Sequence, residues 1–153
     1  MSPGGKVRYI ATALAALSSL LLVLALARRA ESADEYKVVV NAASPVSSLR
    51  RRDLSDMFLG KKTQWPSGGK VLPVEQSATS PVRAAFTRDV HGKSVANVLN
   101  YWQQIIFSGR GLPPASKAGD EEVMEFVRGD RGAVGYVSPG AAVTGLKVIT
   151  LEP

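Results

Sequence analysis

The chain has 153 residues, a formal net charge of +6 and no cysteine. The lack of cysteine excludes a disulfide framework, a thiolate metal site and lipid attachment through a lipobox cysteine. The basic residues are mostly dispersed. The densest group, residues 50–52, has no interleaved aromatic residues and no nucleic-acid motif, so we expect a solvated face there and no nucleic-acid partner.

An uncharged, leucine-rich segment, residues 9–27, lies near the N-terminus behind two basic residues. This layout predicts an export signal over residues 1–27, with Ala25 and Ala27 as the small residues before a signal-peptidase cut. Nineteen uncharged residues are also enough for a helix to span a bilayer, so an uncleaved membrane anchor is the alternative. Both interpretations place the rest of the chain in the periplasm or another extracytoplasmic space, with residues 9–27 as its only membrane contact.

The remaining 126 residues suffice for one domain with one core. Residues 28–35 mix charges with small side chains and predict a linker, so we expect the folded domain to span residues 36–153. Its first element is a strand at residues 38–40, where three consecutive valines are apolar on both faces, as in a sheet covered by helices.

The following elements are predicted from apolar spacing, caps and breakers. First comes a short helix that ends at Gly60, with Leu54, Met57 and Phe58 inward, and then a loop over residues 61–70 with Trp65 folded back. A strand over residues 71–75 follows.

The next helix begins at Pro81 with Ser80 as N-cap, and its apolar face consists of Val82, Ala85, Phe86 and Val90. A further helix is capped by Ser94, and its apolar stripe consists of Val95, Val98, Leu99, Trp102 and Ile106.

After a loop over residues 108–119, the last helix runs from Asp120 to Gly129 with Val123, Met124, Phe126 and Val127 inward. Strands over residues 133–137 and 147–151 complete the domain.

Strands that alternate with helices predict an α/β fold with a partly parallel sheet. The inventory of catalytic groups is small. His91 is the single histidine, with Asp89 two residues away, and no Gly-x-Ser-x-Gly sequence occurs, which disfavours a serine hydrolase. Acidic residues at the start of the helix from Asp120 are explained by the helix dipole. We therefore expect a protein that is not an enzyme and that holds no cofactor and no metal.

The turn over residues 76–83 is the best candidate for a binding site. It joins a strand to a helix start, where free backbone N–H groups and a partial positive charge suit an anion. Ser77, Thr79 and Ser80 can add hydroxyl hydrogen bonds, and Arg83 can add a charged fork. A plain capped helix after a polar loop is the competing interpretation of the same residues.

Three elements taken together resemble the phosphate-transport substrate-binding proteins, over about residues 36–151. The first is Leu54-x-x-Met57-Phe58-Leu59-Gly60-Lys61-Lys62-x-x-Trp65, the second is the serine-rich turn that leads to Phe86, and the third is Gly132-Ala-Val-Gly-Tyr-Val137. The match is closest to short members with a single lobe of the periplasmic-binding-protein type.

The resemblance implies a phosphate turn that in the family reads Arg-x-x-x-Ser-Gly-Thr, with a phenylalanine six residues after the serine. Counting back from Phe86 places Ser80 at that serine. Gln76, Pro81 and Val82 then stand at the family's arginine, glycine and threonine. Proline has no N–H to donate, so the full phosphate cage is not reproduced, and one lobe supplies half of the family's cleft.

On this basis the sequence predicts an extracytoplasmic anion-binding protein, with phosphate as the leading ligand and an ABC permease or another envelope protein as a partner. The predicted ligand-binding residues are Gln76, Ser77, Thr79, Ser80 and Arg83. The alternative is an interaction module of the cell envelope that kept the lobe and lost the ligand, which the departures at residues 76, 81 and 82 favour.

Overall fold

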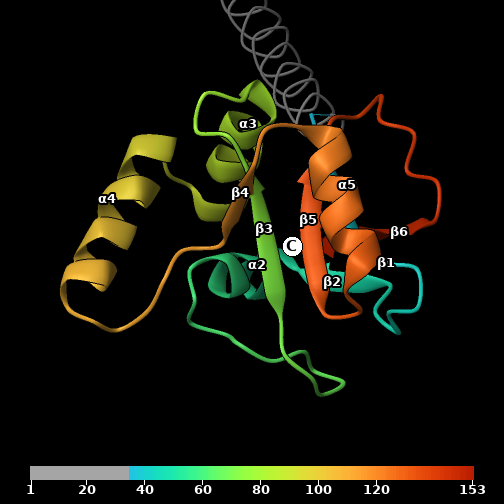
Figure 1. Ribbon diagram of the computed structural model, residues 1–153, viewed down its shortest axis with the longest axis horizontal. Helices are drawn as coiled ribbons and strands as arrows, with labels where there is room; N and C mark the ends of the chain where they lie inside the picture. The colour runs from blue at the N-terminus through green and yellow to red at the C-terminus, as the bar shows by residue number, and fades with distance from the viewer. Residues whose placement is uncertain (1–34) are drawn as a thin grey trace, which may run out of the picture. The chain divides into compact units, whose positions relative to one another are not determined.

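The computed structural model describes residues 35–153. Four helices and a six-stranded mixed sheet in the order β2-β6-β1-β5-β3-β4 make up this part of the chain (Figure 1). The export segment and most of the linker predicted from the sequence lie outside the described residues. The elements are β1 Lys37–Asn41, β2 Ser48–Arg50, α2 Arg51–Phe58, β3 Leu72–Gln76, α3 Pro81–His91, α4 Val95–Phe107, β4 Ala115–Lys117, α5 Asp120–Gly129, β5 Ala133–Val137 and β6 Leu146–Glu152.

The sheet is buried on both faces because its strands alternate their side chains between two cores. In β1, Val38 and Val40 join the core that contains α2 and α3, whereas Val39 joins the core under α5. This alternation is the two-residue period of a strand. The antiparallel pairs are β1 with β5 and β1 with β6, while β3 runs parallel to β4 and to β5. The predicted α/β class with a partly parallel sheet is confirmed.

Aromatic rings fill the core on the side of α2 and α3. Phe86 of α3 stacks on Tyr136 of β5 with ring centroids 3.9 Å apart, and Phe58 of α2 tilts against Phe86 at 4.9 Å. On the other face, Gly135 lets α5 approach β5 closely, because a Cβ there would lie 2.7 Å from Val123 Cγ1. The Gly-Ala-Val-Gly-Tyr element therefore serves the packing of both sheet faces.

Most predicted elements are confirmed, and two short strands were missed. β2 and β4 have three residues each, and β4 lies inside the stretch predicted as a loop. The N-caps at Ser80 and Ser94 accept the expected backbone hydrogen bonds, and Trp65 is buried as predicted. Within residues 35–153, no helix is both long enough and apolar enough to cross a membrane.

The predicted apolar stripe of α4 is only partly correct. Val98 and Trp102 are buried, but Leu99 and Ile106 are 41% and 44% exposed. The reason is the position of α4, which extends to one side of the sheet (Figure 1). Among the helices and strands, α4 packs mainly against α3, so it has too few neighbours to cover its whole stripe.

Candidate anion site at the carboxyl edge

Three parallel strands end at the same edge of the sheet. β3, β4 and β5 finish at Gln76, Lys117 and Val137, and α3 and α5 begin a few residues after β3 and β4 (Figure 1). We call this edge, with the first turns of α3 and α5, the carboxyl edge. In open α/β sheets, ligands bind outside the carboxyl ends of the strands, where helix N-termini favour negative charge.

The turn before α3 presents two of its hydroxyl groups near the surface. Ser77 Oγ lies 3.1 Å from Thr79 Oγ1, and Thr79 is exposed while Ser77 is half-buried. The turn is closed by a hydrogen bond from Ser80 N to the Ser77 carbonyl oxygen at 2.9 Å. Two of the predicted ligand residues are therefore placed where a solute can reach them.

Gln76 and Ser80 are tied into the protein. Gln76 is 3% exposed, and its Nε2 donates to Asp120 Oδ1 at 2.6 Å. Ser80 Oγ donates to Gln76 Oε1 at 2.7 Å and accepts from Arg83 N at 3.3 Å. These two predicted ligand residues link β3 to the starts of α3 and α5.

Arg83 lies inside the protein, away from the position expected from the sequence. Its side chain is 5% exposed and forms an ion pair with Glu75, whose side chain is 4% exposed. Arg83 Nη1 also donates to the Gln76 carbonyl oxygen at 2.8 Å. Burial holds the pKa of Glu75 above its usual value, and the nearby Arg83 opposes that rise. The guanidinium is thus engaged by a carboxylate, and the ligand roles of all five predicted residues stay predictions.

Sequence reasoning missed Asp120 and Ser138 as members of this site. Asp120 is the first residue of α5, and Ser138 directly follows β5. Asp120 Oδ1 accepts from Ser138 N at 3.0 Å, and Ser138 Oγ donates to Asp120 Oδ2. Asp120 was expected only to interact with the helix dipole, because nothing in the local pattern shows which strand ends would meet it.

The single histidine lies in an apolar setting. His91 Nδ1 is 2.8 Å from Ser55 Oγ, and its ring lies against Phe58 and Phe86. Burial, aided by the positive charge of Arg83, lowers the pKa of His91 to about 4. Asp89 accepts from the Tyr36 hydroxyl and pairs with Arg51. The His91 ring thus packs against two aromatic rings and lies within hydrogen-bond distance of Ser55.

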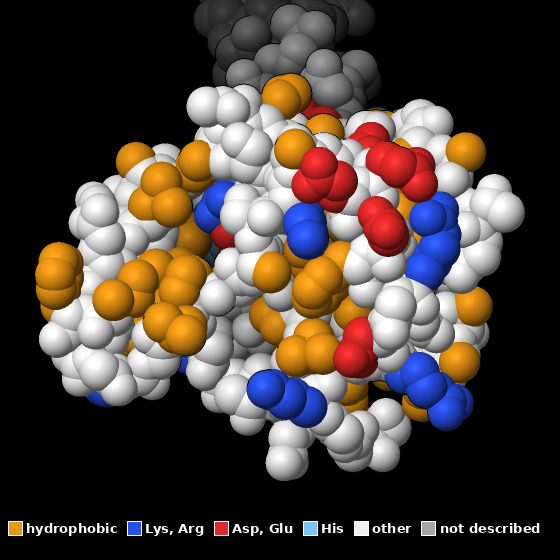
Figure 2. Space-filling model, in the orientation of Figure 1, with side chains coloured by type: hydrophobic (Ala, Val, Ile, Leu, Met, Phe, Trp, Pro, Cys, Tyr) orange, Lys and Arg blue, Asp and Glu red, His pale blue; other side chains and the backbone are white. Residues whose placement is uncertain are grey.

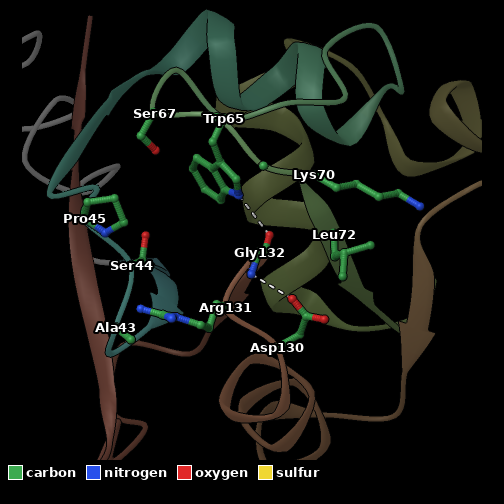
Figure 3. Close-up of a pocket in the computed structure, with 12 residues that line it drawn as sticks. Ala43, Ser44, Pro45, Trp65, Ser67, Lys70, Leu72, Asp130, Arg131 and Gly132 are labelled. Carbon is green, nitrogen blue, oxygen red and sulfur yellow. Dashed lines mark hydrogen bonds between the residues drawn. The ribbon is translucent and has the colours of Figure 1, made fainter.

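A cavity of about 470 Å³ lies at the opposite end of the strands (Figure 3). Its walls come from the segments before β3 and β5 and from the turn after β1. Trp65 Nε1 donates to the Gly132 carbonyl oxygen at 3.0 Å, and Gly132 N donates to Asp130 Oδ1 at 2.7 Å. Figure 3 shows the Lys70 amine directed away from these groups. Among residues 35–153, no cluster of three or more histidine or acidic side chains could hold a metal.

The architecture of residues 35–153 defines a class: a single α/β lobe with two helix starts at the carboxyl ends of parallel strands. Solved structures with this fold include an ABC-type phosphate transport receptor from Vibrio cholerae, which is 23% identical and has a TM-score of 0.62. The match covers 77% of this chain and 46% of the receptor.

A second solved structure has the same fold. It is described as a phosphate ABC transporter substrate-binding protein from Clostridium perfringens with bound phosphate, is 21% identical and has a TM-score of 0.63. The match covers 77% of this chain and 45% of that protein. No protein-family model and no curated protein matches the chain. The chain therefore has the fold of one part of a phosphate-binding protein and spans less than half the length of these structures.

Proposed function

We propose that this domain works outside the cytoplasm as a binding protein for a small oxyanion, with phosphate as the leading ligand, and that it is not an enzyme. The observation that carries the proposal is the pair of accessible hydroxyls, Ser77 and Thr79, at the start of an eleven-residue helix. Hydroxyls and helix N-termini suit oxyanions. The phosphate-binding proteins that share the fold support the choice of ligand.

The part of those proteins that this chain matches is less than half of their length, and we propose that residues 35–153 contact the ligand from one side. A ligand held from one side keeps part of its hydration and forms fewer hydrogen bonds. We therefore expect weak phosphate binding, with a dissociation constant on the order of 1 mM. An ABC permease or another envelope protein then completes the site from the open side.

A phosphate titration of the purified full chain, followed by NMR signals of the backbone amides of residues 77–80, 82 and 83, tests this proposal. We expect saturable shifts near millimolar phosphate, because an anion bound at the start of α3 lies beside these amides. Replacing Ser77 and Thr79 together by alanine should weaken binding at least about fivefold, since two hydroxyl hydrogen bonds are lost. The matched control is Ser67→Ala, which removes an exposed hydroxyl at the opposite cavity. Amide shifts that do not saturate with phosphate, or that are the same in the double variant and the wild type, would contradict the proposal.

The second candidate function is an interaction module of the cell envelope. It is favoured by exposed apolar side chains that gather on α4 and the loop after it (Figure 2). Phe107 is 90% exposed and Leu112 is 80% exposed, and exposed apolar surface of this kind marks contact sites. A photo-crosslinking residue at position 107 should form one discrete adduct with a partner protein in the native envelope, whereas the same residue at position 148 in β6 should not. A ladder of adducts from both positions would exclude the module.

A further inference from the structure

The carboxylate of Asp120 is bound at the carboxyl edge as a separate oxyanion would be. Three donors converge on it: Gln76 Nε2 at 2.6 Å, Ser138 N at 3.0 Å, and Ser138 Oγ. They come from the ends of two neighbouring strands, β3 and β5. An amide, a backbone N–H and a hydroxyl are the neutral donors that proteins use to hold a carboxylate or a phosphate.

One of these donors, the Gln76 amide, is positioned by contacts that do not involve Asp120. The Gln76 side chain is fixed by Ser80 Oγ at its oxygen and by the Tyr136 carbonyl oxygen, which its Nε2 approaches at 3.3 Å. The backbone N–H of Gln76 donates to the Tyr136 hydroxyl at 3.2 Å. Because these contacts hold Gln76 from β5 and α3, its amide stays in place when the carboxylate is removed.

We infer that Gln76 and Ser138 form an oxyanion subsite at the carboxyl edge, and that the Asp120 carboxylate fills this subsite and keeps free oxyanions out of it. The part of this inference that concerns phosphate affinity rests on the proposed function, whereas the part that concerns free carboxylates does not. Asp120 also opposes anion binding through its charge, because its carboxylate repels an anion that approaches Ser77 and Thr79.

The neighbouring surface adds to this repulsion. Glu121 and Glu122 share the first turn of α5 with Asp120, and acidic side chains gather over that part of the molecule (Figure 2). Glu121 is held by Arg128 at 3.3 Å, and Glu122 accepts from Ala118 N at 3.0 Å. These two carboxylates have partners of their own outside the subsite, which makes Asp120 the one that occupies it.

Asp120→Ala tests the inference by chemical rescue of the full chain. The substitution leaves three donors without their acceptor, so the midpoint of thermal unfolding should fall. Added formate or acetate should restore much of the loss in a saturable way, because a free carboxylate enters the vacated subsite and stabilises the folded state by mass action. The wild-type protein should not respond. Sodium chloride at equal ionic strength controls for screening.

The matched control is Glu121→Ala, which removes a carboxylate from the same helical turn outside the subsite. It should show no rescue by formate. Phosphate should bind Asp120→Ala about tenfold more tightly than it binds the wild-type protein, since a like charge and an occupant have been removed together. Asp120→Asn keeps the side-chain volume and removes the charge, so it should bind phosphate more tightly than the wild type yet show no formate rescue.

The two proposals fail in distinguishable ways. If formate rescues Asp120→Ala while phosphate binds neither protein, the subsite assignment stands and the phosphate function is wrong. If phosphate binds the wild-type protein and both Asp120 variants equally and formate rescues neither variant, the inference is overturned and the phosphate function stands. If Asp120→Ala does not fold, equal phosphate affinities of Asp120→Asn and the wild type overturn the inference.

Discussion

Replacing Arg83 by alanine should lower the free energy of unfolding by about 3–5 kcal/mol, because it leaves the buried carboxylate of Glu75 without its cation. The two side chains are 5% and 4% exposed, so water cannot replace the lost partner. The Gln76 carbonyl oxygen also loses the donor that lies 2.8 Å away. Urea unfolding of the full chain, followed by circular dichroism at neutral pH, measures the loss.

The matched control for this prediction is Arg88→Ala, on the same helix. Arg88 pairs with Glu35 at the surface, where its side chain is 66% exposed, so its loss should cost less than about 1 kcal/mol. Replacing both members of the buried pair, as Glu75→Leu with Arg83→Met, should recover much of the stability, since no isolated charge is left inside. A loss below 1 kcal/mol for Arg83→Ala would show that the pair is solvated and free to serve a ligand.

The buried pair of Glu75 and Arg83 also determines which variants can test anion binding at the carboxyl edge. Arg83 is predicted from the sequence to supply charge to the ligand, but a variant that loses the buried ion pair with Glu75 would lose binding through unfolding as well. Ser77 and Thr79 are better probes, because they are accessible and their replacement leaves the core untouched. Asp120→Asn is the most direct probe, since it changes the charge at the edge and keeps the shape.

Much of the fold could be predicted because its signals are local. A run of three valines marks β1, the apolar stretch Ala133–Val137 marks β5, and the serine caps at Ser80 and Ser94 fix the starts of α3 and α4. Each of these signals lies within a few residues of the element that it starts or forms. The order of elements, and with it the α/β class, follows from such signals alone.

The missed strands have no such signal. β2 is three residues long with one buried side chain, Leu49, and β4 has only exposed or half-buried residues. β2 forms by pairing with β6, and β4 forms by pairing with β3. The exposed part of the α4 stripe has a related cause, since periodicity shows that a helix has an apolar face and does not show what covers it.

The turn predicted as the candidate site lies between β3 and α3, and its contacts with Asp120 were not predicted. The turn before α3 could be found because serine, proline and a helix start are adjacent in the chain. The contact between Gln76 and Asp120 joins residues 44 positions apart, and the one between Asp120 and Ser138 depends on β5 lying next to β3. Glu75 precedes Gln76 in β3, but that its side chain meets Arg83 follows only from how α3 packs on the sheet.

Acidification from pH 7 to pH 5 should lower the free energy of unfolding through His91 by about 2 kcal/mol. Burial lowers the pKa of His91 in the folded protein to about 4, while the unfolded chain titrates near the usual value of about 6.5. Between these pH values the unfolded state binds a proton that the folded state does not bind. The contribution of neutral His91 to the free energy of unfolding is therefore complete above about pH 6.5 and declines as the pH falls towards 4. Urea unfolding at both pH values measures the difference.

The variant His91→Gln isolates this contribution. Glu75 acts in the opposite direction, because its pKa is raised in the folded protein and acidification then favours the folded state. That effect is common to both proteins and cancels in the comparison. The variant should therefore lose about 2 kcal/mol less than the wild type between pH 7 and pH 5. Equal losses in the two proteins would mean that His91 takes up its proton in the folded state as readily as in the unfolded chain, and that the ring is not enclosed by Phe58 and Phe86 in solution.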